Sequence, residues 1–185
     1  MGKPLDSIFF VGPMGAGKTT IGKLLAKKLG RKFIDSDGYI QECTGADIPW
    51  IFEKEGEEGF RRRETKALDE LTKLPNLVLA TGGGAVMSKQ NRNMLQERGL
   101  VIYLNASVDV QTERTRKDKN RPLLKNPSPR QVLHRLYTRR HPYYQQIADI
   151  EVITGHTYPK QMVAEIITAL NNLGYEFDIQ DNATI

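Results

Sequence analysis

Short strand-like runs of apolar residues alternate with longer stretches whose apolar residues recur at helical spacing. The strand-like runs lie at residues 8–11, 32–34, 77–80, 101–104 and 150–153. Such short, largely apolar runs are typical of strands buried inside a sheet. Strands that alternate with helices predict a parallel sheet covered on both faces. We therefore expect an α/β fold, a three-layer αβα sandwich around a five-stranded parallel sheet.

The stretches between these runs predict amphipathic helices. The stripe after the first strand is Ile21, Leu24, Leu25 and Leu29, and the last helix carries Met162, Val163, Ile166, Ile167 and Leu170. Between residues 44 and 55 we expect a short helix that packs Trp50 and Phe52 against the core. A longer helix should follow, with its inward positions at Phe60, Ala67, Leu68 and Leu71.

The length and composition fit a single domain. The 185 residues suffice for a substantial core, and 26% charged with 39% hydrophobic residues is ordinary for a globular protein. We expect one domain over residues 1–173 and a poorly ordered tail at 174–185. The only cysteine, Cys43, excludes an intrachain disulfide and fits a reducing compartment. No secretory or membrane-spanning run is visible, so we expect a cytoplasmic protein without a membrane partner.

A phosphate-binding loop follows the first strand. Residues 12–20 read Gly-Pro-Met-Gly-Ala-Gly-Lys-Thr-Thr, which matches the full G-x-x-x-x-G-K-[ST] pattern between a strand and a helix. Glycines let successive N–H groups turn toward an anion, and the helix adds the positive end of its dipole. We expect a nucleoside triphosphate to contact Gly15, Ala16, Gly17, Lys18, Thr19 and Thr20, with the Thr19 hydroxyl on Mg²⁺.

Two carboxylates, Asp35 and Asp37, follow the second predicted strand. Carboxyl ends of strands in open α/β sheets are where ligands bind. The alternative is that one of the two aspartates only caps the next helix. Residues 35–38 also fit the loose D-x-x-G pattern of GTPases.

Basic residues gather in three segments of a chain with net charge +5 and a pI of about 9.3. The segments are residues 61–63, 114–121 and 135–140. In a nucleotide-binding chain they indicate clamps for phosphate and carboxylate groups, although many will be plain surface charges. Arg61 lies near a helix N-terminus, where the dipole does not favour a cation, so an anionic ligand explains it better.

Gly82, Gly83 and Gly84 follow the third predicted strand without interruption. Three glycines lose much backbone entropy on folding, and a plain turn needs one or two. We therefore expect a ligand to approach the main chain here.

Later in the chain, residues 116–129 are rich in charge, asparagine and proline, which predicts a mobile lid.

Taken together, these motifs resemble the shikimate kinases, in the nucleoside monophosphate kinase branch of P-loop folds. The resemblance covers about residues 5–170. It rests on the phosphate loop, Asp35-Ser36-Asp37, Gly59-Phe60-Arg61, Thr81 with the three glycines, Arg121-Pro122-Leu123-Leu124 and Arg140-His141-Pro142-Tyr143-Tyr144. It implies transfer of the ATP γ-phosphoryl group to the 3-hydroxyl of shikimate, on the way to chorismate and the aromatic amino acids.

The resemblance also implies roles for single residues. Asp37, Arg61, Gly83 and Arg140 would bind shikimate, the two arginines on its carboxylate and Asp37 on its hydroxyls. The shikimate-binding region would span about residues 35–62. Asp37 would also orient the attacking hydroxyl, while Lys18 and Arg121 neutralise the transferred charge. Mg²⁺ would be held by Thr19 and, through water, by Asp35. Adenine would lie between Arg114 and the loop that contains Pro159.

Three alternatives are weaker. The first is a gluconate-type kinase on the same fold, but Arg61, the glycines and Arg140 together favour a cyclic hydroxy-carboxylate as substrate. A GTP-dependent switch needs an N-K-x-D signature, whereas Asn105-Ala106-Ser107-Val108 follows the fourth strand. A nucleic-acid-binding module needs exposed aromatics among its basic residues.

His134, His141 and His156 show no metal-site spacing. We expect a monomer whose partners are shikimate and ATP.

Overall fold

The computed structural model describes residues 7–116, 128–155, 157–175 and 177. Its centre is a sheet of five strands in the order β2-β3-β1-β4-β5, with every neighbouring pair parallel. The strands are β1 (Ser7–Val11), β2 (Lys32–Asp35), β3 (Leu77–Ala80), β4 (Leu100–Ala106) and β5 (Ile150–Thr154). The predicted five-stranded parallel sheet is confirmed.

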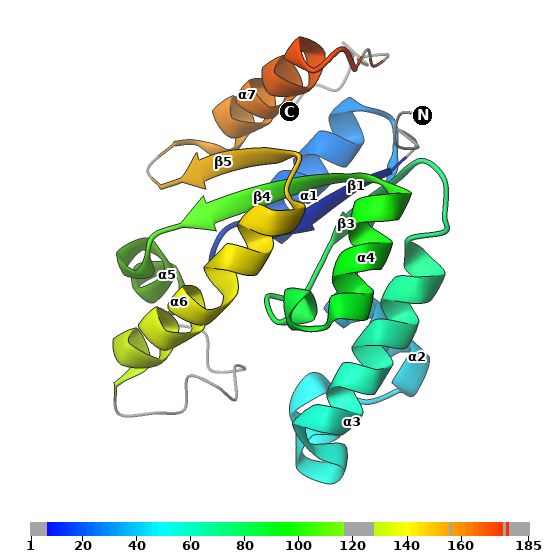
Figure 1. Cartoon of the computed structure of the whole chain (residues 1–185), viewed down its shortest axis with the longest axis vertical. Helices are drawn as coiled ribbons and strands as arrows, with labels where there is room; N and C mark the ends of the chain where they lie inside the picture. The colour runs from blue at the N-terminus through cyan, green and yellow to red at the C-terminus, as the bar shows by residue number, and fades with distance from the viewer. Residues whose placement is uncertain (1–6, 117–127, 156, 176, 178–185) are drawn as a thin grey trace.

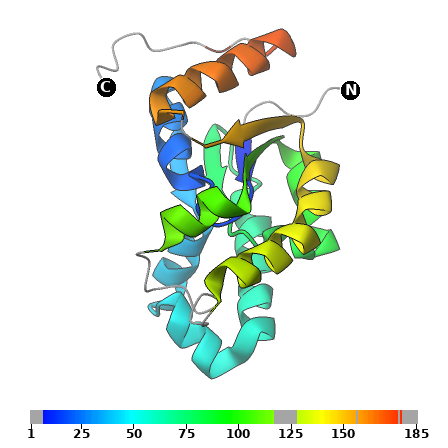
Figure 2. The same cartoon turned by 90° about the vertical axis from the view of Figure 1, so that its left-hand side faces the viewer.

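Helices cover both faces of this sheet (Figure 1). They are α1 (Lys18–Lys28), α2 (Ser36–Thr44), α3 (Ile48–Leu71), α4 (Lys89–Arg98), α5 (Val108–Thr115), α6 (Pro129–Ile147) and α7 (Pro159–Asn172), with a short 3₁₀ turn η1 (Ala85–Met87). The view at right angles shows α1 and α7 on one side of the sheet and α4 and α6 on the other (Figure 2). The three-layer αβα sandwich is therefore confirmed.

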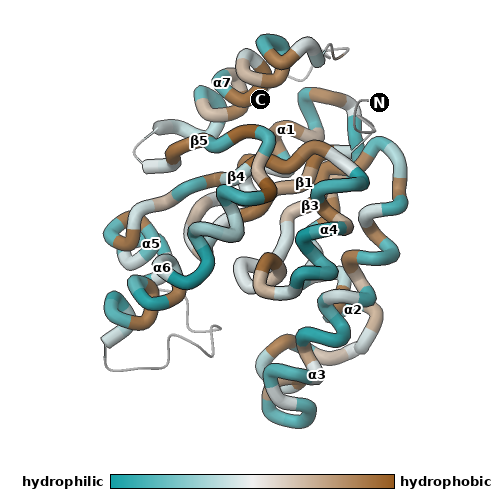
Figure 3. The backbone as a smooth tube through the Cα atoms, in the orientation of Figure 1, coloured by the Kyte–Doolittle hydropathy of each residue, from teal (hydrophilic) through white to brown (hydrophobic). Residues whose placement is uncertain are grey.

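Alternation along the strands divides the core in two. Ile8 and Phe10 of β1 pack toward α1 and α7, whereas Phe9 and Val11 pack toward α3, α4 and α6. Both faces are apolar because each side of a parallel sheet is covered by helices. The hydropathy colouring shows this continuous apolar centre, with polar residues concentrated on the outer helices (Figure 3).

The helix between residues 44 and 55 differs from the expectation. It is the first part of α3, which continues to Leu71 with a break at Gly56, where φ is 69°. Trp50 is 49% exposed, because the fully buried Ile51 occupies the core-facing position of this turn. The aromatic contact is instead between Phe52 and Phe60, whose ring centroids are 4.8 Å apart. The predicted packing of Trp50 against the core was wrong.

The remaining predicted helices have the expected inward faces. Phe60, Ala67, Leu68 and Leu71 are buried in α3, as is the apolar stripe of α7. Near the chain end, Tyr175 and Phe177 pack against the core on the α1 side. The rest of the tail, residues 176 and 178–185, lies outside the described residues, as does most of the predicted lid.

Candidate active site

The central strand β1 leads directly into the phosphate-binding loop. Gly12 has φ of 145°, and a Cβ there would overlap the carbonyl oxygen of Leu104 on β4. Gly15 and Gly17 also have positive φ, 76° and 95°, and Gly17 is the N-cap of α1. Only glycine adopts such angles without strain. The loop therefore curls at the N-terminus of α1, where backbone N–H groups and the helix dipole favour an anion.

Lys18 is folded over its own loop. Its Nζ donates to the carbonyl oxygens of Gly12 at 2.8 Å and Pro13 at 2.9 Å. These contacts hold the ammonium group at the mouth of the loop, where a triphosphate would meet it. Thr20, also in the first turn of α1, lines an adjacent cavity.

Asp35 caps the next helix and also contacts the phosphate loop. Its Oδ1 accepts from the N–H of Asp37 at 3.0 Å and of Gly38 at 3.4 Å, so it caps α2. Its Oδ2 accepts from the Thr19 hydroxyl at 2.7 Å. A hydroxyl and a carboxylate side by side at the phosphate loop are hard oxygen ligands of the kind Mg²⁺ takes together with substrate phosphates. The residues therefore fit this ion, although the described residues contain no cluster of three or more His, Cys, Asp or Glu side chains that could hold a metal.

The three glycines after β3 make room for charged side chains. A Cβ at Gly82 would lie 2.9 Å from both Asp37 Oδ1 and Glu64 Oε1. A Cβ at Gly84 would overlap the guanidinium of Arg61, and one at Gly83 would lie 3.5 Å from Arg140 Nη1. Gly82 and Gly84 thus leave space that the protein's own charged side chains occupy, whereas a Cβ at Gly83 would make only ordinary contacts. The buried Ser36 hydroxyl anchors the loop by accepting from the Gly82 N–H at 3.1 Å.

Arg61 is held in an ion-pair network on α3. Its Nη1 donates to Glu64 Oε2 at 2.7 Å and its Nη2 to Glu57 Oε1 at 3.3 Å. Burial would lower the pKa of Arg61, but these two carboxylates outweigh it and raise that pKa. The guanidinium therefore stays charged and faces the glycines.

Glu64 is almost completely buried, at 1% exposure. Burial raises its pKa to about 7, against the lowering effect of Arg61, and nearby Asp37 adds to the rise. Its Oε1 has no hydrogen-bond partner among the described residues. A buried acceptor in that state is a place for a hydroxyl or water donor.

Arg140 reaches the same place from α6. It is 6% exposed and contributes, with Arg61 and Glu64, to the electrostatics of the buried Tyr144 hydroxyl. Tyr144 lies one helical turn after Arg140, and its hydroxyl donates to the carbonyl oxygen of Gly83 at 2.5 Å. The structure therefore brings Asp37, Arg61, Gly83 and Arg140 together beside the phosphate loop.

The predicted adenine contacts lie on the other side of the loop. Arg114 donates to the carbonyl oxygens of Gly15 at 2.9 Å and Gly155 at 2.6 Å, which ties the phosphate loop to the segment after β5. Pro159 begins α7 and lines a cavity of about 590 Å³ together with Thr19, Thr20, Lys23, Leu24, Tyr158 and Lys160. Arg121 and the predicted lid residues 117–127 lie outside the described residues.

Three functional candidates were missed from the sequence: Glu64, Ser36 and Tyr144. Glu64 left a signal, because it is an acidic residue at an inward position of the stripe that contains Phe60, Ala67 and Leu68. The roles of Ser36 and Tyr144 depend on contacts with glycines 46 and 61 positions away, and periodicity cannot reveal those.

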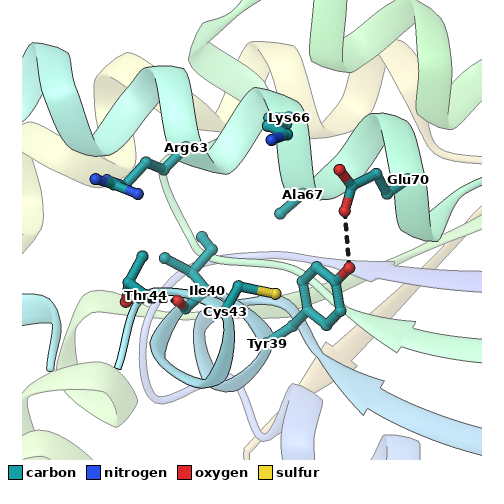
Figure 4. A pocket seen from close by; sticks show the side chains of 8 residues that line it. All are labelled: Tyr39, Ile40, Cys43, Thr44, Arg63, Lys66, Ala67 and Glu70. Atoms are coloured by element: carbon teal, nitrogen blue, oxygen red, sulfur yellow. Dashed lines mark hydrogen bonds between the residues drawn. The ribbon is translucent and has the colours of Figure 1, made fainter. Parts of the chain in front are cut away.

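His141 and Cys43 make their contacts away from these charged groups, and His156 lies outside the described residues. His141 Nδ1 is bonded to the Tyr103 hydroxyl at 2.9 Å, and the ring stacks on Tyr137. Cys43 lines a separate cavity of about 240 Å³ between α2 and α3 (Figure 4). The hydrogen bond drawn there runs from Tyr39 to Glu70, at 2.7 Å, and raises the pKa of Tyr39.

Known proteins match this chain over nearly all of its length. The sequence model described as "Shikimate kinase" matches residues 14–171. Shikimate kinase of Psychrobacter arcticus is 63% identical, covering 93% of this chain and 92% of its own. That of Haemophilus influenzae is 54% identical, covering 90% of this chain and 93% of its own.

Within the described part of the chain, no helix has the length and apolarity to span a membrane.

Solved structures agree. The shikimate kinase of Acinetobacter baumannii in complex with shikimate superposes with a TM-score of 0.91 at 48% identity, covering 94% of this chain and 97% of that one. A deoxyadenosine kinase of M. mycoides with bound dATP shares the fold alone, with a TM-score of 0.56 at 19% identity. The phosphate loop, the charged side chains around the three glycines and these matches lead to one assignment: the chain belongs to the shikimate kinase family.

Proposed function

We propose that the charged groups around the three glycines bind shikimate, with Arg61 and Arg140 on its carboxylate and Asp37 and the Gly83 N–H on its hydroxyl-bearing ring. The reaction itself follows from family membership. The chain transfers the γ-phosphoryl group of ATP to the 3-hydroxyl of shikimate, a step of aromatic amino acid biosynthesis. The observation that carries the residue assignment is the convergence of two arginines and an aspartate beside the phosphate loop.

The chemistry matches these groups. Two guanidinium groups with fork geometry suit a carboxylate, and a carboxylate acceptor suits a hydroxyl donor. Asp37 accepts a hydrogen bond from the attacking 3-hydroxyl and takes its proton as the oxygen–phosphorus bond forms. ADP leaves as the bond between the β,γ-bridging oxygen and the γ-phosphorus breaks. Because phosphoryl transition states are largely loose, orientation contributes more than the strength of the base.

The nucleotide side of the site is the phosphate loop. Backbone N–H groups of Gly15, Ala16 and Gly17 and the Lys18 ammonium bind the phosphates. Thr19 would ligate Mg²⁺ directly and Asp35 through water, and the bound ion would neutralise phosphate charge. Adenine lies between Arg114 and Pro159, near Thr20.

Arg121, in the proposed lid at residues 116–129, supplies a further positive charge to the transferred group. Lid closure excludes water, which suppresses ATP hydrolysis.

We further propose that the protein is a cytoplasmic monomer, with one domain over residues 1–173.

The substrate is tested by ADP release from Mg·ATP in the presence of shikimate, of gluconate, or of neither. We expect shikimate alone to stimulate release, because two arginines and an aspartate select a hydroxylated ring acid. Equal, slow release in all three reactions would contradict the substrate assignment.

Replacement of Arg61 tests the carboxylate clamp. Arg61→Ala should raise the KM for shikimate about 10- to 100-fold, because a charge-assisted hydrogen bond is worth about 1.5–3 kcal/mol. Arg62→Ala is the matched control, since Arg62 forms an exposed pair with Glu58 and should leave KM unchanged. An unchanged shikimate affinity of Arg61→Ala in calorimetry would exclude the clamp.

Replacement of Asp37 tests its role in the chemical step. Asp37→Asn should lower kcat by about 10²–10⁴, because the amide cannot take the proton, while calorimetry should find ATP binding retained. Asp47→Asn is the control, because Asp47 caps α3 and asparagine caps equally well. Turnover of Asp37→Asn close to wild type would show that this carboxylate is not needed.

A further inference from the structure

Tyr144 is a core residue whose hydroxyl also reaches the candidate site. It is fully buried, and its ring stacks on Tyr103 with centroids 4.9 Å apart. Tyr103 is fixed in turn by the hydrogen bond between its hydroxyl and His141 Nδ1. The stack leaves the Tyr144 hydroxyl at one end, where it donates to the Gly83 carbonyl oxygen at 2.5 Å.

That carbonyl belongs to the peptide that separates the two arginines. A Cβ at Gly83 would lie 3.5 Å from Arg140 Nη1, whereas one at Gly84 would overlap the Arg61 guanidinium. The peptide between these glycines is thus flanked by Arg140 on one side and Arg61 on the other. Glycine is the most conformationally free residue, so a run of three needs an external restraint to hold one geometry.

The Tyr144 hydroxyl is suited to that restraint. Burial raises its pKa, against the lowering effect of Arg140, so the hydroxyl stays protonated and keeps donating. Its position on α6, four residues after Arg140, places both side chains on the same face of one helix. The helix that supplies one arginine therefore also fixes the peptide beside that arginine.

We propose that Tyr144 is a positioning residue for shikimate: its hydroxyl fixes the Gly83–Gly84 peptide and thereby sets the spacing of Arg61 and Arg140. Tyr144 does not touch the reacting atoms. The inference rests on the proposed function, because it presumes that these two arginines hold the substrate carboxylate.

The test is Tyr144→Phe, which removes the hydroxyl and keeps the stack on Tyr103. We expect the KM for shikimate to rise about three- to tenfold, the range for one lost hydrogen bond, while kcat and the KM for ATP stay within twofold. Tyr103→Phe is the matched control, because it removes a hydroxyl from the same stack that does not reach Gly83. It should leave all three constants unchanged.

Two outcomes would overturn the positioning role. One is an unchanged shikimate KM in Tyr144→Phe. The other is a Tyr144→Phe protein that fails to fold, or melts well below Tyr103→Phe and loses kcat, because the hydroxyl would then serve the core as a whole. Arg140→Ala belongs in the same series. If its shikimate KM is unchanged, the clamp itself fails, whereas a raised KM there with an unchanged Tyr144→Phe refutes only the role of Tyr144.

Discussion

Charged side chains from α2, α3 and α6 converge on one strip of backbone, the three glycines after β3. Asp37 and Glu64 each place an oxygen 2.9 Å from the position of a Gly82 Cβ, Arg61 occupies the space beside Gly84, and Arg140 approaches Gly83. Buried charges are stable only when they are paired and hydrogen-bonded. The site therefore depends on side-chain-free backbone that lets opposite charges meet.

Glu64 is the buried carboxylate on which this charge pairing depends. Burial raises its pKa to about 7, and its contact with Arg61 at 2.7 Å is what still favours the charged form. The same pair orients the Arg61 guanidinium toward the glycines. The phosphate loop follows β1 and the three glycines follow β3, and these strands are adjacent in the sheet, so the loop and the charged side chains lie side by side.

The sequence predicted the fold well because its signals are local. Buried strands, capped helices and the phosphate loop each lie within a continuous segment, and the structure has them close to the expected residues. Trp50 was misplaced because a short aromatic run does not say which residue of a turn faces inward. The approach of Glu64 to Gly82 and the contact of Tyr144 with Gly83 were missed because they form only when distant elements pack.

The most direct test of this account is calorimetric titration of shikimate into Gly84→Ala. The added methyl has room only if Arg61 moves, because the guanidinium occupies that space, whereas φ at Gly84 is −91° and suits alanine. The account predicts a folded protein that binds ADP normally and binds shikimate at least about tenfold more weakly. Unchanged shikimate affinity in folded Gly84→Ala would contradict it.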